Sequence, residues 1–334
     1  MKKQKKTAYD KATDEANAKK EVKEMMKAGK IKKRVKKLWK HRTIFLFTLP
    51  GMICILLFSY IPLIMGFVLP FKNVNYSLGI WKSPWAGFDN FKFLFTSDAA
   101  WRITRNTVVL NFLFIVTVLA GSVICALFLY QVTSKYVKTY QTIMFFPYFI
   151  SWVVGSYVLL ALLDMDNGML NHILEFFGRE PILWYNEPKY WPVILVISNL
   201  WKNIGYNTII YYTGLLGINE EYYEAAKIDG AGRLQRIRYI TLPLLKTVVI
   251  TMLLLSLSKI FVGNFDMFYN LTQNSAALYP TTDIIDTYVY RSLKTMGDLG
   301  MSSAAGLYQS IVGFVIVLSV NAILRRIDRE NALF

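Results

Sequence analysis

Polar side chains stand inside two long apolar segments of the sequence, where they are costly to place and are therefore candidates for function. Residues 201–207 contain two amides and a phenol at helical spacing beside an indole, and residues 256–266 contain hydroxyls, an ammonium, an amide and a carboxylate. Amides and hydroxyls can hydrogen-bond to a polyhydroxylated solute, and aromatic faces can stack on its C–H faces. These residues predict either a path for a polar solute or hydrogen bonds between helices; they are Trp201, Asn203, Tyr206, Asn207, Ser256, Lys259, Asn264 and Asp266.

Lys259 permits a sharper hypothesis. A cation in the outer half of an apolar segment could attract the carboxylate of an acidic sugar, such as a uronic or sialic acid. Two alternatives are an internal ion pair with Asp266 and extension of the long side chain toward the water interface.

Catalytic and metal chemistry have little support in the sequence. Cys54 and Cys125 both lie in apolar runs, and His41 and His172 are isolated, so no disulfide framework or metal-ligand spacing is present. The G-x-x-x-x-G-K-[ST] phosphate-binding loop is also missing. We therefore expect a chain that binds no cofactor or metal, is not an enzyme, and does not hydrolyse a nucleotide itself.

The segments that must position these residues are long enough to cross a bilayer. Hydrophobic residues make up 54% of the chain and charged residues 18%, which is too apolar for a soluble protein of this length. The composition predicts an all-α membrane protein with six transmembrane helices. The expected spans are residues 44–69, 107–130, 142–163, 191–216, 244–262 and 304–324.

The distribution of basic residues predicts how these spans are oriented. Residues 1–42 contain 17 Lys and Arg against 5 Asp and Glu, a surplus of 12, and residues 131–141, 217–243 and 325–329 are also basic. Six spans place all of these segments on one side, which the positive-inside rule identifies as the cytoplasm, so both termini are expected there. We predict a cytoplasmic tail over 1–42, with a possible interfacial helix over 21–39, and a membrane domain over 43–330. The tail lacks the aromatic residues or fold of a nucleic-acid binder.

Residues 217–243 form a polar island that is itself expected to be ordered. Asn219 is a good N-cap for a short helix over 222–228, and Gly230 can end that helix in the left-handed conformation. A second short basic helix is expected over 233–240, with Pro243 at the start of the next span. The simplest alternative is an amphipathic connector.

This island resembles the cytoplasmic coupling loop of binding-protein-dependent ABC importer permeases. The resemblance rests on Glu-Ala-Ala at 224–226, Asp-Gly-Ala-Gly at 229–232 and Ile-Thr-Leu-Pro at 240–243. Segments at 141–152, 201–206, 283–291, 303–307 and 321–322 are similar to the oligosaccharide branch of the family, so the resemblance covers about residues 40–330. The coupling residues that it implies are Glu224, Ala225, Ala226, Asp229, Gly230, Ala231, Gly232 and Pro243.

The resemblance implies the type I importer permease fold, with cytoplasmic coupling helices, in a bacterial plasma membrane. It further implies a heterodimer with a second related permease, two cytoplasmic ATPase subunits that bind ATP and Mg²⁺, and an extracellular solute-binding protein that delivers an oligosaccharide. On this basis Glu224 would pair with a basic residue of the ATPase, and Gly230 would permit close backbone approach. Asp229 would cap the second short helix or remain a solvated turn residue. Tyr206 and Ser256 fall where maltose-type permeases hold their sugar.

Two other functions are weighed against this one. An importer of a non-sugar solute, such as a modified peptide or a lipid precursor, would be favoured by an apolar path. A membrane-embedded glycosyltransferase would need clustered carboxylates at a membrane face. Asp283 and Asp286 are the close pair available for that role, but their spacing fits a docking or helix-start element better.

Overall fold

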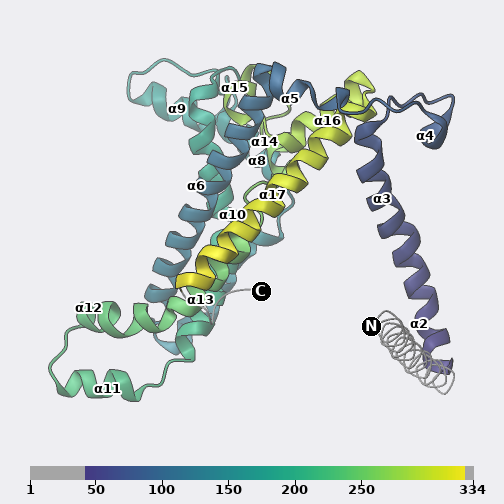
Figure 1. Ribbon diagram of the computed structural model, residues 1–334. Helices are drawn as coiled ribbons and strands as arrows, with labels where there is room; N and C mark the ends of the chain where they lie inside the picture. The colour runs from purple at the N-terminus through teal and green to yellow at the C-terminus, as the bar shows by residue number, and fades with distance from the viewer. Residues whose placement is uncertain (1–41, 328–334) are drawn as a thin grey trace, which may run out of the picture. The chain divides into compact units, whose positions relative to one another are not determined.

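The computed structural model describes residues 42–327, which are almost entirely helical (Figure 1). Within this range no strand forms, and Lys72 and Trp85 make an isolated antiparallel bridge. The chain separates into two compact units, residues 1–65 and 66–334, and each is described by itself. The predicted tail helix over 21–39 lies outside the described residues, so the boundary near residue 42 stays a prediction.

The described part of the first unit, residues 42–65, lies in a nearly continuous run of apolar helix. Helix α2 (Arg42–Ile55) passes through a π-helical segment (Leu56–Tyr60) into α3 (Ile61–Val68), and a 3-10 turn (Leu69–Phe71) ends the run. Pro62 lies two residues after the end of the π-helical segment. A proline lacks its N–H and clashes with the carbonyl four residues earlier, and the extra residue of a π turn relieves that conflict without ending the helix.

Four long helices build the second unit: α6 (Asp98–Leu129), α10 (Trp191–Leu216), α13 (Leu242–Leu257) and α17 (Leu299–Ile327). Shorter helices connect them or lie at their ends (Figure 1). These are α4 (Gly79–Lys82), α5 (Phe93–Thr96), α7 (Ser134–Phe145), α8 (Trp152–Leu163), α9 (Met169–Phe176), α11 (Glu221–Ile228), α12 (Arg233–Arg236), α14 (Phe265–Leu271), α15 (Tyr279–Thr282) and α16 (Ile285–Met296).

Not every predicted span is a straight apolar helix. In the described part of the chain, four helical runs are long and apolar enough to cross a membrane, and a bent pair would make a fifth. The four are Arg42–Phe71, Asp98–Leu129, Arg233–Leu257 and Leu299–Ala322. Helix α10 has the predicted bounds, but its amides and Lys202 leave it less apolar than these runs.

The third predicted span, 142–163, is the bent pair. The run Lys135–Phe149 and helix Trp152–Leu163 meet at 97°. Pro147 lies in the 3-10 turn that ends the first part, and the Ser151 hydroxyl accepts a hydrogen bond from the Val154 N–H to begin the second. The break frees the carbonyls of Tyr148 and Ile150 from helical hydrogen bonding. The Lys202 ammonium of α10 donates to both, at 3.1 Å in the case of Tyr148.

The core of the second unit lies between α6 and α10 and extends toward both ends of these helices. At one end Leu110, Trp152, Trp191, Met267 and Ile284 belong to a buried cluster that joins α6, α8, α10 and α14. At the other end Ala126, Tyr211, Leu215 and Leu245 join α6, α10 and α13. Segments far apart in the sequence are therefore packed around the same two helices.

Candidate functional site

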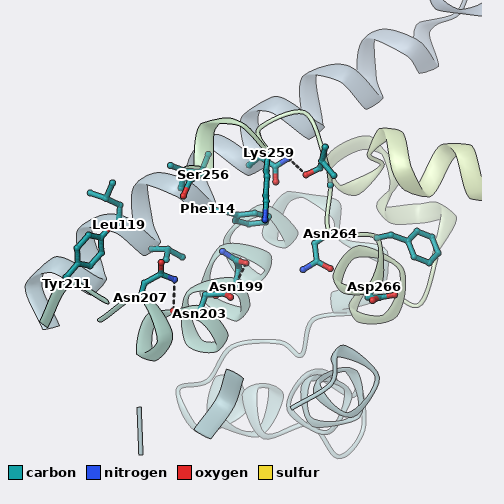
Figure 2. A pocket seen from close by; sticks show the side chains of 16 residues that line it. Phe114, Leu119, Asn199, Asn203, Asn207, Tyr211, Ser256, Lys259, Asn264 and Asp266 are labelled. Atoms are coloured by element: carbon teal, nitrogen blue, oxygen red, sulfur yellow. Dashed lines mark hydrogen bonds between the residues drawn. The ribbon is translucent and has the colours of Figure 1, made fainter. Parts of the chain in front are cut away.

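A cavity of about 610 Å³, lined by both polar and apolar side chains, opens between α6, α10 and the chain that follows α13 (Figure 2). One face of α10 contributes four of its lining residues at intervals of four, namely Asn199, Asn203, Asn207 and Tyr211. Residues four apart lie on the same side of a helix, so the sequence spacing alone brings these side chains together. Apolar side chains of α6, including Phe114 and Leu119, form part of the opposite wall.

The amides of α10 are held in place by their own helix. Asn203 Nδ2 donates to the carbonyl and to Oδ1 of Asn199, both at 2.9 Å, and Asn207 Nδ2 donates to the Asn203 carbonyl at 2.9 Å. Among the described residues no donor reaches Oδ1 of Asn203 or Asn207. The cavity therefore offers oriented amide acceptors to a ligand with hydroxyl groups.

Six of the eight predicted path residues line this cavity: Asn203, Asn207, Ser256, Lys259, Asn264 and Asp266. Trp201 and Tyr206 are not among its lining residues. Tyr206 stacks instead on Tyr148, with ring centroids 4.8 Å apart and 12° between the planes, and on Phe145. The prediction missed Asn199 and Tyr211, although the four-residue spacing from Asn203 and Asn207 pointed to both.

Lys259 extends into the cavity from the turn that follows α13 (Figure 2). It is the cation among the lining residues, and Asp266 is the acid. The alternative of an ion pair between them is wrong, because no bridge within 4.0 Å joins them in residues 42–327. Asp266 lies in the first turn of α14, where a helix N-terminus favours negative charge. The Lys259 ammonium is thus left available to a ligand.

The turn that carries Lys259 is fixed by hydrogen bonds from three separate helices. Asn111 of α6 donates to the Ile260 carbonyl at 2.9 Å, and Gln309 of α17 donates to the Phe261 carbonyl at 2.7 Å. The Gly263 N–H donates to Asp286 Oδ2 at 2.8 Å, and Gln309 donates to the same oxygen at 3.1 Å. These partners lie up to about 150 residues from the turn, so no local pattern indicated them.

Asp286 also packs so closely against Gly263 that position 263 has room only for glycine. A Cβ atom on Gly263 would lie 2.6 Å from Asp286 Oδ2 and 2.3 Å from Ile284 Cδ1, so a larger residue does not fit. Burial raises the pKa of the Asp286 carboxyl, while the hydrogen bonds from Gly263 and Gln309 act in the opposite direction.

Asp283 has a different set of partners from Asp286. It is buried between Arg102 (3.3 Å) and Arg291 (2.5 Å), and it accepts a hydrogen bond from Thr287 at 3.1 Å. The two carboxylates thus fasten separate parts of the structure near the start of α16. They do not form the paired acid and base that a glycosyltransferase would need.

The predicted coupling loop contains the short helix α11, which ends as the sequence indicated. Asn219 Oδ1 accepts a hydrogen bond from the Glu221 N–H at 3.1 Å. At the other end the Ala231 N–H reaches the Ala226 carbonyl at 2.8 Å, and Gly230 adopts a φ of 79°. This is the Schellman arrangement, which requires a left-handed residue. A Cβ on Gly230 would meet nothing within 4 Å, so no described segment approaches it closely.

The second coupling helix differs from its prediction in two respects. Helix α12 continues through a π-helical segment (Ile237–Thr241) into α13, so no break separates it from the next span at Pro243. As at Pro62, the π turn just before the proline lets the helix continue. Asp229 does not cap this helix, because the side chain of Gln235 bonds the Gly232 N–H at 2.7 Å and Asp229 lies at the C-terminal end of α11.

The predicted coupling residues lie on a segment that is largely exposed. Glu224, Ala225, Asp229, Gly230, Gly232 and Pro243 are exposed, and Ala226 and Ala231 are half-buried. Ile228 and Leu234, which the prediction did not single out, expose 87% and 81% of their surface. Helices α11 and α12 lie at the end of the unit where α6 ends, and α9 and α15 lie at the opposite end (Figure 1).

Comparisons with known proteins agree on one family. Residues 121–329 match the model of the binding-protein-dependent transport system inner membrane component family. The chain is 32% identical to Protein LplB of Bacillus subtilis (strain 168) over 308 residues, which cover 92% of this chain and 96% of the relative. It is also 32% identical over 308 residues to the polygalacturonan/rhamnogalacturonan transport system permease protein YteP of the same organism, covering 92% and 95%.

A solved structure extends the similarity to the fold. A chain from a bacterial ABC transporter involved in the import of the acidic polysaccharide alginate superposes with a TM-score of 0.79 at 32% identity. The match covers 88% of this chain and 98% of that one. The fold is therefore that of a type I ABC importer permease, a multi-pass membrane protein, and not that of an enzyme.

Proposed function

Because this chain belongs to the family of binding-protein-dependent transport system inner membrane components, we propose that it imports an acidic oligosaccharide through the cavity between α6, α10 and α13. The observation that carries the proposal is the Lys259 ammonium, which reaches into a cavity lined with amides and has no acidic partner among the described residues. The amides would hydrogen-bond sugar hydroxyls, and Lys259 would pair with a sugar carboxylate.

The names of similar proteins support this substrate class. One relative is named for polygalacturonan and rhamnogalacturonan transport, and the solved structure belongs to a transporter of the acidic polysaccharide alginate. The competing proposal, a non-sugar solute such as a peptide or lipid precursor, would be favoured by an apolar path. The row of three amides and one phenol on α10 does not favour it.

The working importer would contain this chain, a second homologous permease, two ATPase subunits that bind ATP and Mg²⁺, and an extracellular binding protein. Both termini and the segment 217–243 would face the cytoplasm, as the distribution of basic residues indicates. The exposed Glu224 and Ile228 of α11 would dock in a cleft of one ATPase subunit. Closure of the ATPase dimer on ATP would then draw the coupling helices together and switch the cavity between its two openings.

Reconstitution tests this function directly. The chain is co-expressed with the partner permease, ATPase and binding protein encoded beside it, placed in proteoliposomes, and supplied with labelled galacturonate oligosaccharides. We expect uptake that requires both internal ATP and the binding protein. Transport of peptides or lipid precursors in preference to both acidic and neutral oligosaccharides would contradict the proposal.

A further inference from the structure

A second cavity, of about 310 Å³, lies between the end of α6 and the coupling helices, and its lining is strongly basic. Lys227 of α11 and Arg233 and Arg236 of α12 all line it, and no carboxylate is among the lining residues. Tyr130, Tyr223 and Thr241 add hydroxyl groups. Three cations around one small space repel one another unless an anion lies between them.

Among residues 42–327, the basic side chains of this cavity have no acidic partner. None of the ion pairs in the described residues involves Lys227, Arg233 or Arg236. The Nε of Arg236 is buried and has no hydrogen-bond partner within residues 42–327, which is costly for a charged donor. The neighbouring hydroxyls are already ordered, since Tyr223 and Thr241 share a hydrogen bond of 3.0 Å. The cavity is thus built around donors that await an acceptor.

We propose that this cavity binds a phosphate group. A phosphate has several acceptor oxygens and a charge that suits guanidinium and ammonium donors together. The cavity adjoins the ends of two candidate membrane spans, Asp98–Leu129 and Arg233–Leu257, which is the level of phospholipid headgroups. The phosphate therefore comes either from an anionic lipid headgroup or from a free anion in solution. In both cases it links α11 and α12 to the end of α6.

The site does not depend on which solute is transported, so its test is independent of the proposed function. The full chain, purified with its ATPase subunits, is titrated with inorganic phosphate by calorimetry in detergent. In parallel it is placed in nanodiscs of phosphatidylcholine with phosphatidylglycerol, and the retained phosphatidylglycerol is counted by native mass spectrometry. Binding in the first arm identifies a free anion, and specific retention in the second identifies a lipid headgroup.

Arg236→Gln is the diagnostic variant, and Arg238→Gln is its matched control. Arg238 lies in the same helical run and is exposed, with its guanidinium 5.7 Å from the Tyr239 ring, and it does not line the cavity. We expect Arg236→Gln to weaken binding at least about tenfold and Arg238→Gln to leave it unchanged. Lys227→Gln, at an exposed position, gives a second reading if Arg236→Gln does not fold.

Three results would overturn the proposal. Absence of binding in both arms would show that the cavity has no affinity for phosphate. Equal weakening by Arg236→Gln and Arg238→Gln would reduce the effect to general surface charge. If the same titration of the chain purified without its ATPase subunits shows binding that the assembled complex lacks, a group of the ATPase occupies the cavity instead.

Discussion

The Asp286 carboxylate accepts a hydrogen bond of 2.8 Å from the backbone N–H of Gly263. This contact joins the first turn of α16 to the turn that carries Lys259, and Gln309 of α17 donates to the same carboxylate oxygen. The position of the Lys259 ammonium in the cavity is therefore set by residues of α16 and α17, and not by α13 alone.

Asp286→Ala should destabilise the protein. The substitution leaves the half-buried Gly263 N–H without its acceptor, while the Gln309 amide keeps only the Phe261 carbonyl, at a cost of about 1–3 kcal/mol. Asp286→Asn keeps one oxygen for Gly263 and should lose less. Thermal unfolding in detergent measures both variants. Asp166→Ala, at an exposed carboxylate, is the control and should not change the Tm.

The stability that Asp286 contributes should depend on pH. Burial raises the pKa of this carboxyl from its ordinary value of 3.8, so the folded state holds the proton more tightly than the unfolded state. Folding stability then falls as pH rises from the unfolded pKa to the raised folded pKa, and the loss is complete above it. The Tm of the wild type minus that of Asp286→Asn should decrease over this window. If the Tm values of the wild type and of Asp286→Asn changed in parallel with pH, Asp286 would not be the group responsible for this pH dependence.

Lys259→Gln should change which oligosaccharides are transported. Removing the ammonium should lower uptake of a galacturonate oligosaccharide at least about tenfold, because a charge-assisted hydrogen bond is lost. Uptake of a neutral oligosaccharide of equal length should change by less than about twofold. Lys246→Gln, an exposed lysine of α13 outside the cavity lining, is the matched control. Equal loss for acidic and neutral substrates would exclude a charge-recognition role for Lys259.

Gly230→Asp should uncouple ATP hydrolysis from transport without unfolding the chain. A non-glycine residue at a φ of 79° costs about 1–2 kcal/mol and would shift the end of α11, where the ATPase is proposed to dock. Substrate-stimulated ATPase activity and uptake should therefore both fall. Gly178→Asp is the control, since Gly178 has a φ of 71° and equally open surroundings after α9. If Gly230→Asp kept both substrate-stimulated ATPase activity and uptake, the proposed coupling role of this loop would be wrong.

Much of the local structure could be predicted because it depends on neighbours in the sequence. The bounds of α10 and the end of α11 at Gly230 follow from apolar length and from the φ that only glycine adopts easily. The break in the third span was missed, although Pro147 and Ser151 are both local signals, because the apolar run concealed them. The continuity of α12 into α13 was missed because a π turn accommodates Pro243.

The sequence by itself determined the membrane class, the polar face of α10 and the short helix α11 before Gly230, because helical periodicity, apolar length and glycine stop signals are properties of short stretches. Only the tertiary structure decided that Lys259 enters the cavity while Tyr206 stacks on Tyr148 outside its lining. It also decided that Asp286 holds the Lys259 turn and that Arg236 is left without a partner. These outcomes depend on contacts between residues distant in sequence, whose geometry is set by how the helices pack.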